Sequence, residues 1–237
     1  MPAPRRVPTS VEPPAPRIHP TAIIEQDVHL GAGCAIWDNV HVRRGTTLGA
    51  ECIVGEKTHI SYDVRIGNRV KINAFVYICT GVTIEDGVMV CAGCVFTNDR
   101  TPRATSSDLS HLRTSEPDEH TTLTTVREGA TLGARSVIGS DLTIGRFAMI
   151  GMGSVVTKSV PDFHLALGNP ARIAGCVCRC GKILFRLGHE RSIGPSVQRC
   201  TACGLQYRMA RGVLSEMPQH GEDADDGVGS PSGHAAK

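Results

Sequence analysis

Apolar side chains recur at every sixth position along most of the chain, and the residue four places after each is almost always small or β-branched. The series consists of Ile18, Ile24, Leu30, Ile36, Val42, Leu48, Val54, Ile60, Ile66, Ile72, Ile78, Ile84, Val90, Phe96, Val126, Leu132, Ile138, Ile144, Ile150 and Val156. A period of six fits neither a helix of 3.6 residues per turn nor an ordinary two-sided strand. It fits a chain that turns a corner after every short strand.

The sixfold pattern predicts an all-β fold, a parallel β-helix in which three short strands make one coil of 18 residues. Residues 18 apart then lie on the same face, separated by one strand spacing of about 4.8 Å. The narrow interior of such a solenoid has little room for rings, which agrees with an aromatic content of only 4%.

The pattern also divides the chain into segments. We expect the β-helix over residues 18–175, interrupted at 97–125, where polar residues replace the apolar series and predict an extruded loop. Long loops in compact folds are usually functional. The cysteine-rich residues 176–212 form a second module. The proline-rich residues 1–17 and the acidic, glycine-rich residues 213–237 are expected to be disordered.

Charge and hydropathy exclude several classes of protein. With 25 Lys and Arg against 23 Asp and Glu, the formal net charge is +2, which gives no reason to expect a nucleic-acid partner. No apolar run approaches the roughly 18 residues that a membrane-spanning helix needs. The N-terminus also lacks the apolar run of a secretion signal. We therefore expect a cytoplasmic protein with no membrane partner.

The cysteines near the C-terminus have the spacing of metal ligands. Cys176, Cys178 and Cys180 are followed by a glycine, and further along Cys200 and Cys203 are followed by another. Two knuckles closed by glycine suit four thiolates around a tetrahedral zinc ion. We expect Cys178, Cys180, Cys200 and Cys203 to hold a structural zinc ion in a module that resembles a zinc ribbon. Cys176 is the alternative to Cys178.

The expected zinc module is basic, and its place in the chain suggests a role. Seven Lys and Arg residues between residues 176 and 212 face a single Glu. We interpret them as a solvated face, paired with the acidic tail, rather than as a nucleic-acid site. Because the module directly follows the solenoid, we expect it to cap the open C-terminal end.

Chemistry-bearing side chains gather in one column of the predicted solenoid. His41, His59 and Tyr77 lie 18 residues apart, so they share one outward face. The column leads toward the start of the extruded loop, where Asn98 and Asp99 stand. Polar groups on a solenoid exterior are common, so the column by itself indicates a site only together with the loop.

The sixfold repeat resembles that of the hexapeptide-repeat acyltransferases, whose coils form a left-handed β-helix. The resemblance covers about residues 18–175. The loop begins with Phe96-Thr97-Asn98-Asp99 and continues to Pro102-Arg103, which is similar to the FTN…PR signature of members that N-acetylate nucleotide-linked amino sugars. Further motifs that match this branch are His19–Ile23, Trp37 with Val40-His41, and Gly168–Arg172.

The resemblance implies an acetyl-CoA-dependent N-acetyltransferase, a homotrimer in which acyl-CoA lies between neighbouring subunits. It gives Asn98 the role of holding the sugar amine for direct attack in a ternary complex. Asp99 or a histidine of the column, His59, would take the proton. We expect His41, Tyr77 and Arg103 to contact the nucleotide-linked amino sugar.

Acetyl-CoA needs a backbone that its pantetheine arm can approach and cations for its phosphates. The coils after the loop contain glycines that leave the backbone open to the pantetheine arm. Lys158 and Arg172 supply cations for the phosphates. The residues expected to bind acetyl-CoA are Gly133, Ala134, Ser140, Gly151, Met152, Lys158 and Arg172.

Two other functions stay open. An O-acetyltransferase acting on a sugar or antibiotic hydroxyl needs a histidine base, for which His41 and His59 are candidates. A non-catalytic adaptor would use the basic zinc ribbon instead. The sugar, its nucleotide carrier and the length of the acyl chain are not determined by these residues.

Overall fold

The computed structural model describes residues 14–114, 116–118, 121–187 and 195–218. The outer parts of both segments expected to be disordered, 1–13 and 219–237, lie outside the described residues. All regular structure within the described part is β, which confirms the all-β class. No helix in this part of the chain has the length and apolarity to cross a membrane.

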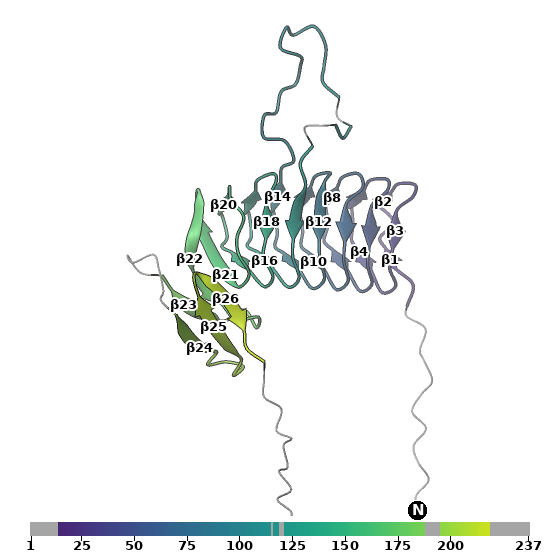
Figure 1. Ribbon diagram of the computed structural model, residues 1–237. Coiled ribbons are helices and arrows are strands. Elements are labelled where there is room, and N and C mark those ends of the chain that lie inside the picture. The colour runs from purple at the N-terminus through teal and green to yellow at the C-terminus, as the bar shows by residue number, and fades with distance from the viewer. Residues whose placement is uncertain (1–13, 115, 119–120, 188–194, 219–237) are drawn as a thin grey trace, which may run out of the picture.

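Three sheets of short parallel strands form the sides of a solenoid (Figure 1). Sheet I contains, in spatial order, β1 (Arg17–Ile18), β4 (Ala35–Ile36), β7 (Ile53–Val54), β10 (Lys71–Ile72), β13 (Met89–Val90), β16 (Thr131–Leu132), β19 (Met149–Ile150), β21 (His164–Gly168), β22 (Ala171–Val177) and β23 (Ile183–Arg186). Sheet II contains β2 (Ile23–Ile24), β5 (His41–Val42), β8 (His59–Ile60), β11 (Tyr77–Ile78), β14 (Val95–Phe96), β17 (Val137–Ile138) and β20 (Val155–Val156). Sheet III contains β3 (His29–Leu30), β6 (Thr47–Leu48), β9 (Arg65–Ile66), β12 (Val82–Ile84), β15 (Thr124–Val126) and β18 (Thr143–Ile144).

The strands of one sheet pair in the register that the sequence predicts: up to the extruded loop, and again from the loop to β20, each residue lies opposite the one 18 positions on. Ile36 pairs with Val54, and Val54 with Ile72. The backbone bends between strands through corner residues with positive φ, such as Asn39 at 53° and Asp63 at 56°. Asn and Asp tolerate this conformation better than other residues with a side chain. The expected solenoid of 18-residue coils is therefore confirmed.

The core is one continuous column of inward side chains along the solenoid axis. From Ile36 to Val156 every member of the sixfold apolar series is at most 4% exposed. The small residues four places on are buried as well, including Thr46 and Thr58, whose hydroxyls donate to backbone carbonyls. Most of these positions hold a small or β-branched residue, and the exception, Leu142, is buried as well.

The extruded loop leaves the solenoid after β14 and returns at β15 (Figure 1). Its two ends are joined, because the backbone N–H of Thr122 donates to the carbonyl of Asn98 at 2.9 Å. Further out, Glu116 forms an ion pair at 3.0 Å with Arg44, which belongs to the second coil. The loop is thus tied to the solenoid at its base and along its length.

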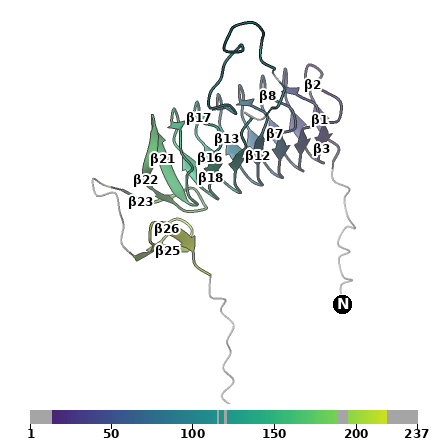
Figure 2. The ribbon, with the colours of Figure 1, turned by 45° about the horizontal axis from the view of Figure 1, so that its top comes forward.

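Beyond the last coil the chain forms a C-terminal module, which we define as β22 to β26. Strand β22 runs antiparallel to β21, and β23 continues sheet I. A separate antiparallel sheet follows, made of β24 (Ser196–Arg199), β25 (Gln206–Ala210) and β26 (Val213–Glu216) (Figure 2). The acidic segment expected to be disordered from residue 213 therefore starts too early. Leu214 of β26 is only 2% exposed, and this apolar contact orders the strand.

Candidate functional site

The base of the extruded loop encloses a pocket of about 330 Å³. The residues that line it are Asn98, Asp99, Pro102, Arg103, Ala104, Arg113, Thr114, Glu116, Asp118 and Thr121. Three residues expected in the site, Asn98, Asp99 and Arg103, thus share one cavity. The chain reaches this place because Asn98 is the second residue after β14, where the coil ends and the loop begins.

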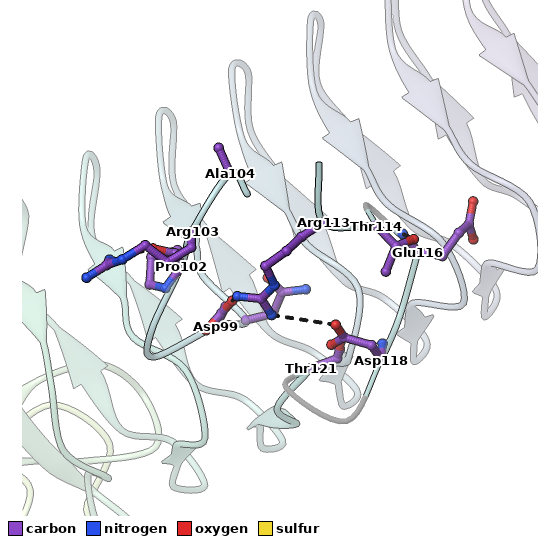
Figure 3. A pocket seen from close by; sticks show the side chains of 10 residues that line it. Asp99, Pro102, Arg103, Ala104, Arg113, Thr114, Glu116, Asp118 and Thr121 are labelled. Carbon is purple, nitrogen blue, oxygen red and sulfur yellow. Dashed lines mark hydrogen bonds and ion pairs between the residues drawn. The ribbon is translucent and has the colours of Figure 1, made fainter. Parts of the chain in front are cut away.

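Arg113 organises the charges in the loop pocket, and the sequence pattern did not reveal it. Its Nη1 lies 3.8 Å from Asp99 Oδ2, and its Nη2 lies 3.6 Å from Asp118 Oδ2 (Figure 3). The other oxygen of Asp99 accepts the backbone N–H of Thr101 at 2.6 Å. One guanidinium therefore faces two carboxylates from opposite ends of the loop, which holds both ends around the cavity. An arginine in a polar loop carries no periodic signal.

The outward column of sheet II is formed as predicted. The His41 and His59 rings lie 5.1 Å apart edge to face, and His59 stacks on Tyr77 at 5.3 Å. Burial, followed by the charge of His41, lowers the pKa of His59. The shift favours the neutral form of His59, which is the form that accepts a proton. Tyr77 keeps 44% of its surface exposed.

Glu25 completes this column, and sequence reasoning missed it. Its Oε1 lies 2.9 Å from His41 Nε2 and 2.9 Å from Arg43 Nε, and its Oε2 accepts the backbone N–H of Arg44 at 3.0 Å. The backbone hydrogen bond from Arg44 is the main cause that lowers the pKa of Glu25. A carboxylate that fixes a histidine is a frequent arrangement in acid–base catalysis. Glu25 stands 16 positions before His41 rather than 18, so the column pattern did not indicate it.

The column and the loop pocket occupy different places within one chain. None of His41, His59 and Tyr77 lines the pocket that contains Asn98. His59 lies two coils from Val95, at a spacing of about 10 Å. Proton transfer from an amine held at Asn98 to His59 therefore requires substrate or a neighbouring subunit to connect them, whereas Asp99 already adjoins Asn98.

The residues expected to bind acetyl-CoA fall at two corners of the last coils. Gly133-Ala134 and Gly151-Met152 stack at the corner between sheets I and II, and Met152 is 82% exposed. At Gly133 a Cβ would lie 2.5 Å from the backbone N of Met152, so the coil itself demands glycine there. Ser140, which is buried, and Lys158, which is exposed, lie at the other corner, where the chain leaves β17 and β20 of sheet II. Arg172 is exposed on β22.

Four thiols of the C-terminal module converge. The Sγ atoms of Cys178, Cys180, Cys200 and Cys203 all lie within 4.8 Å of one another. Cys178 and Cys203 are 3.4 Å apart, and Cys180 and Cys200 are 3.7 Å apart. A tetrahedral shell with Zn–S bonds of about 2.3 Å places sulfur atoms roughly 3.8 Å apart, so the cluster fits this ion. Cys176 is buried outside the cluster.

Two backbone turns, each closed by a glycine, hold these thiols. Gly181 N–H donates to the Cys178 carbonyl and Gly204 N–H to the Cys200 carbonyl, with φ of 86° and 79°. These angles favour glycine. The backbone N–H groups of Cys203 and Ala202 lower the pKa of Cys200 to about 6, whereas burial raises that of Cys178 to about 12. A bound divalent cation would keep all four as thiolates.

Comparison with protein families identifies the repeat. The family described as bacterial transferase hexapeptide (six repeats) matches residues 63–98. The family described as hexapeptide repeat of succinyl-transferase matches residues 21–55 and 124–158. The chain therefore carries the repeat of the hexapeptide transferases on both sides of the extruded loop.

Curated relatives match parts of the chain. A dTDP-3-amino-3,6-dideoxy-α-D-galactopyranose 3-N-acetyltransferase of Aneurinibacillus thermoaerophilus is 44% identical over 94 residues, which is 40% of this chain and 45% of that protein. Serine acetyltransferase of Escherichia coli K12 is 48% identical over 50 residues, 21% of this chain and 18% of the enzyme. The chain thus matches less than half the length of these relatives.

Solved structures match the chain at low similarity. PerB of Caulobacter crescentus, in complex with CoA and GDP-perosamine, is 23% identical with a TM-score of 0.40, covering 68% of this chain and 58% of PerB. A point mutant of the N-acyltransferase AntD of Bacillus cereus, in complex with dTDP and coenzyme A, is 17% identical with a TM-score of 0.42. The match covers 69% of this chain and 81% of AntD.

Proposed function

We propose that this hexapeptide-repeat protein is an acyltransferase that moves an acetyl group from acetyl-CoA to the amine of a nucleotide-linked amino sugar. The observation that carries the proposal is the pocket at the base of the loop, where Asn98 and Asp99 stand side by side. The similarity to a sugar 3-N-acetyltransferase supports the same activity. A nucleotide-linked 3-amino sugar is therefore the first substrate to test.

The chemistry needs a positioned amine and an acceptor for its proton. The Asn98 amide orients the sugar nitrogen toward the thioester, and the new N–C bond forms as the C–S bond to CoA breaks. Asp99 takes the amine proton, and its ion pair with Arg113 fixes the carboxylate in place. A neutral sugar amine is itself a nucleophile, so transfer is direct and no acyl-enzyme forms. Burial raises the pKa of Cys79 to about 12, which makes it a poor nucleophile.

Acetyl-CoA is proposed to lie along the corner at Gly133 and Gly151, where glycines leave the backbone accessible. Met152 would flank the pantetheine arm, and Lys158 and Arg172 would meet its phosphates. This placement puts the thioester on the C-terminal side of the loop, because these residues follow β15 in the coil order.

A homotrimer is proposed from the character of sheet II. Apart from His41 and His59, its outward side chains are apolar or aromatic, whereas sheet III carries a histidine, an arginine and threonines on its outer face. Ile23, Tyr77 and Val95 keep 56%, 44% and 36% of their surface exposed. Copies that pack along this face would bring a neighbour's loop near His59. We also infer from the family a left-handed winding, and from ten cysteines outside any disulfide a reducing, cytoplasmic location.

The four-cysteine cluster is proposed to hold one structural zinc ion. Zinc supplies a closed tetrahedral shell that fastens the two glycine turns together, and with four protein ligands it has no open position for a substrate. The ion therefore belongs to the fold rather than to the transfer reaction.

A thiol-release assay with acetyl-CoA and a panel of nucleotide-linked 3-amino and 4-amino sugars tests the proposed activity. Wild-type protein should turn over an amino sugar, and Asn98→Ala should lower kcat/KM at least about 100-fold through lost positioning. Thr97→Ala, next to it on the solvent side, serves as the matched control and should stay within about threefold. Turnover that survives Asn98→Ala unchanged would contradict the assignment of the site.

An O-acetyltransferase is the second candidate, because Glu25 and His41 form a carboxylate–histidine pair at 2.9 Å. Such a pair suits removal of a proton from a hydroxyl. Acetylation of hydroxyl sugars with no turnover of the amino sugars, abolished by His41→Ala, would favour it over N-acetylation.

A further inference from the structure

The C-terminal module is built directly onto the last coil. Strand β21 pairs with β19 of that coil and with β22 of the module. The backbone N–H of Val177, one residue before the first ligand of the thiol cluster, donates to the carbonyl of Phe163 at 2.8 Å. The first cysteine turn therefore starts from a strand that already belongs to the end of the solenoid (Figure 2).

Three aromatic rings connect the thiol cluster with this coil. Tyr207 of β25 is fully buried, and its ring meets that of Phe163 edge to face at 5.4 Å. Phe163 in turn stacks at 5.6 Å on Phe147, which lies in the turn between β18 and β19. The rings run without a gap from the module into the last coil.

The hydroxyl of Tyr207 reaches the cluster itself. Its Oη lies 3.0 Å from Cys178 Sγ and accepts the backbone N–H of Arg179 at 3.0 Å. Since Arg179 supplies a donor, the tyrosine hydrogen is free to point at the sulfur. A metal-bound thiolate accepts hydrogen bonds, and partners of this kind orient the ligand and strengthen metal binding.

Arg179, between two of the cysteines, adds a second connection. Its guanidinium lies 4.9 Å from the centre of the Phe147 ring and 3.4 Å from a carboxylate oxygen of Glu216 on β26. The same turn therefore contacts the last coil on one side and the final strand of the module on the other. A shift of the cysteine turn would disturb both.

We propose that Tyr207 is a positioning residue that couples the metal centre to the end of the solenoid, so that the metal-loaded module is the C-terminal cap of the β-helix. This inference rests on the zinc site proposed above. Metal binding fixes Cys178, Tyr207 holds Cys178 against the aromatic rings, and the rings hold the turn between β18 and β19. Loss of the metal then loosens the last coil, which carries Gly151, Met152 and Lys158 of the residues proposed for acetyl-CoA.

Two measurements on the full chain test the coupling. The first compares hydrogen exchange of the Met149–Gly168 region in zinc-loaded and chelator-treated protein, with the His59–Ile78 region as internal reference. We expect exchange in Met149–Gly168 to rise at least tenfold on zinc removal and the reference to change less than twofold. An unchanged Met149–Gly168 region in protein shown to have lost its zinc would overturn the cap.

The second measurement isolates the hydroxyl. Tyr207→Phe keeps the ring and removes the donor, and it should weaken zinc binding about tenfold in competition with a chromophoric chelator. The thiolate-to-metal absorption of the Co²⁺ form should shift as well, which a purely structural change would not produce. Tyr62→Phe, in the solenoid, is the control and should do neither. Wild-type zinc affinity in Tyr207→Phe would refute the role of the tyrosine.

The failure modes are distinct. Protein that binds no zinc in elemental analysis would refute the metal site and this inference together, while the acetyl-transfer assay would still decide the proposed activity. Protein that binds one zinc ion per chain but shows neither the exchange change nor the Tyr207→Phe effect would keep the metal site and refute the coupling alone.

Discussion

The two ends of the solenoid are finished differently. At the N-terminal end Ile18 keeps 46% of its surface exposed, and Leu30 in the same coil is only partly buried. At the C-terminal end Ile150 and Val156 are each 1% exposed, and β21 continues the sheet beyond β19, with Ala166 opposite Ile150. A repeat buries each coil only against its neighbours, so it has no means of covering its own ends. The C-terminal cover therefore has a sequence of its own, outside the sixfold pattern.

The cover also differs from the solenoid in what stabilises it. The solenoid buries a long column of aliphatic residues. Among the described residues, the second core cluster contains only seven buried ones, and two of them are cysteines of the thiol cluster. A small module with so little apolar burial usually depends on a metal or on its neighbours. In this chain the last coil is the neighbour, and the proposed zinc ion would be the metal.

The largest effect on this contrast is expected from Phe163→Ala, which removes the middle ring between the module and the last coil. Truncation of a buried phenylalanine typically costs about 3–5 kcal/mol. Native-state hydrogen exchange should show the loss in β19 to β22 and no change in β5 to β11. A uniform loss along the whole solenoid would mean that the end is not a separate stability unit.

An intermediate effect is expected from a matched pair of substitutions in the apolar series. Ile150→Ala empties a closed site and should cost about 2–5 kcal/mol. Ile18→Ala, at the open end, should cost under about 1 kcal/mol, since much of that side chain is already in water. Urea unfolding of the two variants against wild type measures the difference. Equal costs would show that the N-terminal end is covered in solution.

The smallest effect on stability should come from a change in pH. It should arise at His59, in the middle of the solenoid. Burial lowers the pKa of His59 in the folded chain, so the unfolded chain takes up the proton first as the pH falls. The contribution of His59 to stability is full above its usual pKa and is lost progressively below it. Between about pH 7.5 and pH 5.5, a range in which histidine titrates, His59→Gln should therefore lose less stability than wild type. Urea midpoints at the two pH values measure this, and parallel losses would contradict it.

Much of the fold was predictable from the sequence, because a solenoid repeats one local rule. The aliphatic series from Ile36 onward, the 18-residue register and the column of His41, His59 and Tyr77 all follow from position in the repeat. The cysteine spacing likewise indicated which thiols would meet. The prediction that disorder begins at residue 213 was wrong. Leu214 packs in the apolar cluster of the module, and this contact exists only in the folded chain.

The sequence by itself determined every feature whose partners stand at a constant interval along the chain: the coils, the core, the place of the loop and the two cysteine turns. Tertiary structure alone decided the contacts between segments with no common period. Arg113 meets Asp99 across the loop, Glu25 meets His41 off the register, and Tyr207 reaches Cys178. The physical reason is that a hydrogen bond or ion pair depends on distance in space, and only in the repeat does distance along the chain predict it.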